Sequence, residues 1–266
     1  MKYYVVDVFT DEVFGGNPAG VCLLDEWLPD VTLQNIAMEN NLSETAFLVK
    51  QNGYYDLRWF TPAIEVDLCG HATMGSAFVL FSYYETTACK LDFHTQSGVL
   101  TVERKDDMLW MDFPSRPAVR VEQYESIRSA LSVEGFEMYK APDLLVVLDS
   151  EHEVLSALPD LELLKKVKAE ADMPGDNFGV IITAPGSDCD FVSRFFAPNA
   201  GVDEDPVTGR AHCVLIPYWS ARLGRNSMTA RQLSKRGGYI WCEHAGQRVK
   251  IGGKVVLYSS GEIMGF

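Results

Sequence analysis

The sequence has no excess of positive charge. Lys and Arg together number 23 against 37 for Asp and Glu, so the formal net charge at pH 7 is -14. No run of basic residues with interleaved aromatic residues interrupts this acidic balance. Because proteins that bind nucleic acid contact the phosphates through basic surfaces, we expect no nucleic-acid partner.

Long apolar runs and targeting signals are also missing. No stretch is long and apolar enough to cross a membrane, and residues 1–9 lack the basic start and apolar run of a signal peptide. The six Cys have no CxxC spacing, which favours reduced thiols over disulfides or a zinc site. We therefore expect a soluble cytoplasmic protein with no membrane partner.

The motifs of several enzyme classes are absent as well. The sequence contains no GxGxxG segment, no P-loop and no GxSxG turn, so it gives no support for nucleotide binding or serine hydrolysis. The residues His71, His212 and His244 have no metal-ligand spacing among themselves or with the Cys residues. We expect neither a metal nor a cofactor.

Alternating and periodic apolar residues predict a mixed α+β fold in two halves. In the first half we expect strands at 3–9, 20–24, 42–49, 54–60, 91–95, 98–104 and 108–113, with helices from Thr32 to about Asn41 and at 72–81. Residues 114–117 (Pro-Ser-Arg-Pro) are the best candidate linker. In the second half we expect an amphipathic stretch at 153–167, strands at 143–148, 178–183 and 190–196, a helix at 211–219, and short strands within 236–258.

An internal repeat relates the two halves. The segment 58–62 (Arg-Trp-Phe-Thr-Pro) matches 194–198 (Arg-Phe-Phe-Ala-Pro), 136 residues later, and three residues are gained before Gly209, which then matches Gly70. A recurrent turn pattern is the alternative to a duplication. The duplication predicts two pseudo-symmetric domains, residues 1–116 and 117–257, each with a curved, mostly antiparallel sheet around one buried helix. A last strand, about 258–266, can return to the first domain.

Each repeat has a glycine, Gly70 or Gly209, just before an apolar helix. The N-terminus of a helix offers unpaired NH groups and a partial positive charge, so two such ends at one cleft would hold a carboxylate. The alternative is that both glycines only permit tight turns.

Glu44 is an acid in an apolar strand. In the segment 42–48 (Leu-Ser-Glu-Thr-Ala-Phe-Leu), the period of two places Glu44 on one face with Leu42, Ala46 and Leu48. Loss of solvation would raise the pKa of this carboxyl group and suit it to proton transfer near neutral pH. An edge strand with a solvated Glu44, or a Glu44 held by nearby hydroxyl groups, remains an alternative.

Three further residues are candidates for proton chemistry or binding. Cys69 and Asp205 lie 136 residues apart, so a racemase with one base on each face would have a thiol on one side only. Asp205 can bind a substrate amine or cap the following turn. His71, at the helix start, can assist proton transfer or simply pack there.

Five spaced motifs resemble one known family, the phenazine-biosynthesis PhzF family. These motifs lie at residues 14–21 (FGGNPAGV), 41–47 (NLSETAF), 60–62 (FTP), 67–73 (DLCGHAT) and 204–209 (EDPVTG). The resemblance implies the diaminopimelate-epimerase-like fold, with two similar domains around a cleft. It also implies an isomerase of the trans-2,3-dihydro-3-hydroxyanthranilate type, in which Glu44 moves the proton.

The resemblance further implies substrate contacts from Gly70, His71, Asp205 and Gly209, and we add Asn17 of the first motif to these candidates. Where the family usually has a small residue, this chain has Arg210. Its guanidinium group either favours a more acidic substrate, partly fills the pocket or turns to solvent.

The sequence therefore predicts a cofactor-independent isomerase with a small anionic substrate, and a homodimer is the default assembly. An amino-acid epimerase or racemase that uses Cys69, and a non-catalytic protein that binds a metabolite, are the alternatives.

Overall fold

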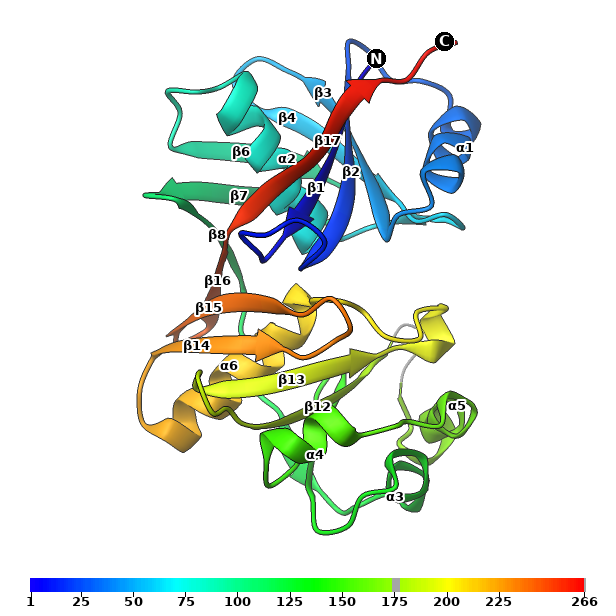
Figure 1. The fold of residues 1–266 in the computed structure, drawn as a ribbon, viewed down its shortest axis with the longest axis vertical. Helices are drawn as coiled ribbons and strands as arrows, with labels where there is room; N and C mark the ends of the chain where they lie inside the picture. Colours follow the sequence, from blue (N-terminus) through cyan, green and yellow to red (C-terminus); the bar gives the residue numbers. More distant parts are fainter. Residues whose placement is uncertain (174–177, 266) are drawn as a thin grey trace. The chain divides into compact units, whose positions relative to one another are not determined.

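The computed structural model describes residues 1–173 and 178–265. The chain forms two compact units (Figure 1): unit 1 contains Met1–Asp112 and Gly252–Phe266, and unit 2 contains Phe113–Ile251. Unit 1 thus ends four residues before the linker boundary expected at 116. The returning segment begins at Gly252 rather than near 258, because the last strand starts at Val255.

Unit 1 is built on one mixed sheet. Its strands pair in the order β17, β1, β2, β3, β4, β6, β7 and β8, and a short strand β5 also pairs with β4. Figure 1 shows the last strand of the chain, β17, beside the first, β1. The strand bounds are β1 Lys2–Val8, β2 Asn17–Leu24, β3 Glu44–Lys50, β4 Tyr55–Phe60, β5 Glu65–Val66, β6 Lys90–Thr95, β7 Gly98–Lys105, β8 Met108–Pro114 and β17 Val255–Glu262.

Unit 2 contains a second sheet with the order β9, β10, β11, β12, β13, β14, β15 and β16. Its 3-10 turn η1 spans Pro198–Ala200. The strand bounds are β9 Val119–Val121, β10 Glu137–Lys140, β11 Leu144–Val147, β12 Val180–Pro185, β13 Phe191–Phe196, β14 Ser227–Gln232, β15 Gly238–Ala245 and β16 Arg248–Gly253.

The two sheets have the same topology. In unit 1 the parallel pairs are β2–β3 and β4–β6, and in unit 2 they are β11–β12 and β13–β14, at the same places in the strand order. The matching segments 58–62 and 194–198 begin within β4 and β13. One long helix follows each of these strands, α2 (Gly70–Tyr83) in unit 1 and α6 (Gly209–Leu223) in unit 2. The duplicated, diaminopimelate-epimerase-like architecture expected from the sequence is therefore present.

Helix α2 is buried on nearly all sides because its residues are small or apolar. Its two buried hydroxyl residues donate within the helix, Thr73 to the carbonyl of Cys69 and Ser76 to the carbonyl of Ala72. This internal pairing removes the cost of burying polar groups. A helix that needs no solvent face can pack against the sheet with its N-terminus fixed in place.

Several local expectations need correction. Helix α1 spans Asp30–Asn40 and its N-cap is Pro29, so Thr32 is not the cap, although Asn41 ends the helix in the left-handed conformation. The amphipathic stretch 153–167 is not one helix. It is divided between α4 (Glu151–Ser156), which begins with a Ser150 capping box, and α5 (Leu161–Glu170), because Pro159 lies between them.

The sequence reading also missed elements of unit 2. Helix α3 (Glu125–Leu131) and strands β9, β10 and β14 were not expected. Among the described residues, no helix combines the length and the apolar character that a membrane crossing demands.

Candidate active site

Glu44 is the first residue of β3, and its side chain is 20% exposed. Strand β3 pairs with β2 on one side and with β4 on the other, so it is a central strand and the edge-strand alternative is wrong. The five residues that follow Glu44 are all buried, on both faces of the sheet. Glu44 is thus an acidic side chain at the start of an apolar strand.

His71 joins Glu44 to Cys69 at the start of α2. Its Nε2 lies 3.1 Å from Oε2 of Glu44, and its Nδ1 lies 3.5 Å from the sulfur of Cys69. Both His71 and Cys69 are buried, at 7% and 6% exposure. Of these three side chains, Glu44 is the most accessible to a small molecule.

The surroundings of His71 shift its proton equilibrium. Burial lowers the pKa of His71, but the hydrogen-bonded contact with the Cys69 sulfur and the negative charge of Glu44 raise it more, so the net pKa is well above 6.5. An imidazolium at neutral pH forms an ion pair with Glu44 and can donate a hydrogen bond to the sulfur of Cys69. Burial, and next the charge of Glu44, raises the pKa of the Cys69 thiol, so this thiol is a poor base at neutral pH.

The same three residues form a possible set of metal ligands. Their ligand atoms all lie within 4.8 Å of one another. A metal ion at this cluster would have to displace the protons of the Cys69 thiol and the His71 imidazolium, because both groups must lose a proton to bind. Without a metal ion, His71 and Glu44 form an ion pair.

Helices α2 and α6 begin in similar ways. Their N-cap residues are Cys69 and Thr208, and neither N-cap side chain makes a capping hydrogen bond. The first helical residues are Gly70 and Gly209, and neither has a positive φ, so the tight-turn explanation does not apply. A Cβ on Gly209 would meet no atom within 4 Å, which leaves open space at this helix start.

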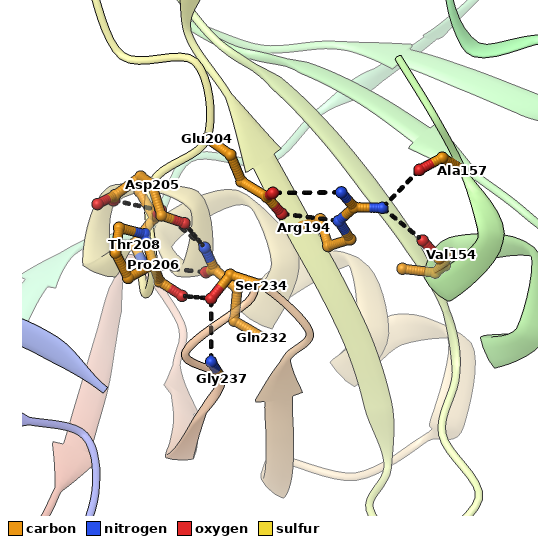
Figure 2. Close-up of polar contacts among 10 residues, drawn as sticks. All are labelled: Val154, Ala157, Arg194, Glu204, Asp205, Pro206, Thr208, Gln232, Ser234 and Gly237. Atoms are coloured by element: carbon orange, nitrogen blue, oxygen red, sulfur yellow. Dashed lines mark hydrogen bonds and ion pairs between the residues drawn. The ribbon is translucent and has the colours of Figure 1, made fainter. Parts of the chain in front are cut away.

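These helix starts change the predicted partner of Cys69. Thr208, and not Asp205, occupies the N-cap position that matches Cys69. The three extra residues of the second repeat lie before the helix, and a constant offset of 136 residues overlooked them. Asp205 instead accepts a hydrogen bond from the Thr208 hydroxyl at 2.5 Å, with Gln232 beside both residues (Figure 2).

Arg210, at the second position of α6, is held by a buried acid. Its Nε donates to Oδ2 of Asp143 at 2.9 Å, and its Nη2 pairs with Oδ1 of the same carboxylate. Asp143 is fully buried and also accepts from the NH of Gly179 at 2.7 Å. The arginine side chain is 30% exposed, so this contact fixes its position without covering it.

The register of the strands shows what unit 2 has in place of Glu44. In unit 1 Thr45 pairs with Phe60, and in unit 2 Val180 pairs with Phe196, which is the repeat partner of Phe60. The residue before Val180 is Gly179, so it occupies the position of Glu44. The acidic residue at β3 therefore has no counterpart in unit 2.

Asn17 begins β2 and is fully buried, opposite Val8 of β1. The preceding Gly16 has a φ of 59°, and a Cβ there would lie 2.0 Å from the carbonyl oxygen of Val8. Glycine is therefore required before Asn17.

Sequence reasoning missed Thr208, Gln232 and Asp143, although the position of Thr208 directly before Gly209 was a usable signal.

Known proteins resemble this chain over nearly its whole length. The sequence model of the phenazine biosynthesis-like protein family (PhzC-PhzF) matches residues 6–261. An uncharacterized isomerase of Pseudomonas aeruginosa is 47% identical over 264 residues, which cover 99% of this chain and 98% of that protein. A human phenazine biosynthesis-like domain-containing protein is 41% identical, with 90% of each chain covered.

Solved structures extend the similarity to the fold. A PhzF-family protein of Enterococcus faecalis superposes with a TM-score of 0.93 at 47% identity, covering 99% of this chain and 98% of that one. A probable proline racemase of Agrobacterium radiobacter shares the fold alone, with a TM-score of 0.64 at 9% identity, covering 99% of this chain and 92% of the racemase. The family match over nearly the whole sequence places this chain in the phenazine biosynthesis-like PhzF family.

Proposed function

We propose that this PhzF-family isomerase moves a proton within a small carboxylate substrate, and that Glu44 is the group that carries the proton. The observation that supports this proposal most directly is the 3.1 Å contact between Glu44 and the buried imidazole of His71. An accessible carboxylate backed by a buried cation can accept a proton and return it. A substrate similar to trans-2,3-dihydro-3-hydroxyanthranilate is our first candidate.

The proposed reaction needs one acid-base group. Glu44 as a carboxylate removes a proton from a carbon next to an electron-withdrawing group, and the electron pair of the broken C–H bond shifts into the substrate's conjugated system. Glu44, now a carboxylic acid, returns the proton to another carbon of that system. His71 as an imidazolium lies 3.1 Å from Glu44 and attracts its carboxylate, because the two charges are opposite.

Binding of the substrate carboxylate is the second part of the proposal. Each unit has one helix start whose N-cap side chain makes no capping hydrogen bond, α2 in unit 1 and α6 in unit 2, and the partial positive charge of a helix N-terminus favours anions. We assign Gly70, Gly209, Arg210 and Asn17 to substrate binding, and His71 and Asp205 to the support of proton transfer. The cytoplasmic location and the homodimer are also kept as proposals.

The decisive experiment is proton exchange in deuterated water. The wild-type protein is incubated with trans-2,3-dihydro-3-hydroxyanthranilate and a panel of amino and hydroxy carboxylates, and deuterium at carbon is read by mass spectrometry. We expect Glu44→Gln to reduce the exchange rate by a factor of about 10² to 10⁴, the usual contribution of general acid-base catalysis to a rate. Exchange at the wild-type rate in Glu44→Gln would contradict the assignment.

Matched controls separate the alternatives. Cys69→Ser should retain exchange if Glu44 carries the proton, whereas an epimerase that relies on the thiol would lose it. Dialysis against EDTA should leave the rate unchanged, and a loss restored by zinc would instead assign the cluster of Glu44, Cys69 and His71 to a metal. Thermal stabilisation by a carboxylate without any exchange would favour the non-catalytic binding protein.

A further inference from the structure

Gln232 is a buried amide whose hydrogen-bonding groups all point to one segment. It is the last residue of β14 and is fully buried. Its Oε1 accepts from the backbone NH of Thr208 at 2.9 Å, and its Nε2 donates to the carbonyl of Asp205 at 2.7 Å and to Oγ1 of Thr208 at 3.1 Å. Figure 2 shows this amide between the two residues.

The contacts of Gln232 fix the direction of the hydrogen bonds around it. The NH of Thr208 can only donate, so it must face Oε1, and a flipped amide would place NH₂ against NH. The Nε2 group therefore points to the two oxygen acceptors. Because Nε2 can only donate, the Thr208 hydroxyl accepts from it and directs its own proton to Oδ2 of Asp205, 2.5 Å away.

These hydrogen-bond directions also determine how the carboxylate of Asp205 is bonded. Because the Thr208 hydroxyl donates, the carboxylate of Asp205 is a hydrogen-bond acceptor in this arrangement. Two neighbouring contacts hold the same segment: the NH of Asp205 donates to the carbonyl of Phe195, and the hydroxyl of Ser234 donates to the carbonyl of Pro206. The segment from Asp205 to the start of α6 is thus fixed in both backbone position and hydrogen-bond direction.

We propose that Gln232 is a positioning residue that holds Asp205 as a hydrogen-bond acceptor for the substrate. This inference rests on the proposed function, in which Asp205 belongs to the binding site. An acceptor recognises a donor, so Asp205 would bind an amino or a hydroxyl group of the substrate candidates proposed above. Gln232 itself does not touch the substrate in this proposal.

The substitution Gln232→Glu tests the proposal with little change in shape. The new carboxylate still accepts from the NH of Thr208, but it cannot donate to the carbonyl of Asp205. It also attracts the Thr208 hydroxyl proton away from Asp205. We expect kcat/KM for the exchanging carboxylate to fall by a factor of about 10 to 100, with most of the loss in KM, because a polar contact to the substrate is misplaced.

A pH profile distinguishes positioning from simple damage. Below the pKa of the carboxyl group that Gln232→Glu introduces, that group regains one OH donor, so the ratio of variant to wild-type activity should rise as the pH falls. The matched control is Gln34→Glu, which makes the same change at an amide that donates to the carbonyl of Thr61 in unit 1. This control should show no such rise and little loss of activity.

Two readouts do not depend on turnover. The ¹³C shift of the Asp205 carboxyl carbon should move in Gln232→Glu and stay in place in Gln34→Glu. The Thr208 NH should keep a hydrogen-bonded shift in Gln232→Glu, which still offers an acceptor, and lose it in Gln232→Met, which offers none. If wild-type protein exchanges no proton on any carboxylate, the proposed function fails and these shifts still test the positioning. An unchanged Asp205 shift, or wild-type kcat/KM in a folded Gln232→Glu, would overturn the inference.

Discussion

At the scale of single residues, His71 lies between a thiol and a carboxylate in unit 1. Its two ring nitrogens contact different partners, Cys69 and Glu44, inside a buried environment. The raised pKa makes the ring a resident cation close to the one acid at the start of β3. Such a cation adds to the stability of the fold while it keeps its proton.

This linkage gives a prediction about pH and stability. Because the pKa of His71 is higher in the folded protein than its ordinary 6.5, protonation favours the folded state. The gain in unfolding free energy is complete below pH 6.5 and is lost as the pH rises through the raised pKa of His71. Replacing His71 by Asn should therefore cost about 1–3 kcal/mol of unfolding free energy at pH 6 and less at pH 9, as measured by urea unfolding.

The difference in unfolding free energy between the wild type and His71→Asn is free of the titration of distant groups, since both proteins contain those groups. A stability difference that stays constant, or that grows between pH 6 and pH 9, would show that the imidazole is neutral in the folded protein.

At the scale of elements, the repeat gives each unit the same strands but different chemistry. The start of β3 carries Glu44, whereas the matching position before β12 is Gly179. A Cβ at Gly179 would lie 2.1 Å from the ring of Phe195, so no side chain fits there. Asp143 directly precedes β11, the strand that pairs with β12, and its carboxylate binds Arg210.

The crowding at Gly179 predicts a large difference between two similar glycine substitutions. Gly179→Ala should lower the unfolding free energy by about 1–3 kcal/mol, because Phe195 must leave its place. Gly209→Ala should change it little, since its Cβ meets no atom within 4 Å and its φ is not positive. Thermal unfolding of both variants gives the comparison, and equal melting temperatures would refute the assigned packing.

At the scale of the whole molecule, the chain returns to its first unit at the end. Seven residue pairs join β17 to β1, so the N-terminal and C-terminal strands are neighbours in one sheet (Figure 1). A chain that ends at Lys254 should therefore leave β1 with a bare edge, lose most of its melting transition and aggregate. A chain that ends at Glu262 is the control, because it keeps β17 complete.

Circular dichroism and light scattering measure this effect. A chain ending at Lys254 that stays soluble and unfolds at the wild-type temperature would mean that unit 1 does not need its last strand.

The sequence by itself determined the class of fold, the repeat and the family, because each is written in short local patterns. The segments 58–62 and 194–198 repeat visibly, and the apolar helices after Gly70 and Gly209 need no partner to be recognised. It also selected Glu44, since an acid is conspicuous in an apolar strand. It misplaced the partner of Cys69, and its single amphipathic stretch at 153–167 did not separate α4 from α5, because three inserted residues and one proline alter geometry more than composition.

Only the tertiary structure decided which side chains meet. The contact of His71 with Glu44 joins a helix start to a strand 27 residues earlier, and that of Arg210 with Asp143 spans 67 residues. The amide of Gln232 reaches Thr208 across 24 residues. No periodicity encodes such contacts, because they depend on how strands pair and on where a helix begins above the sheet.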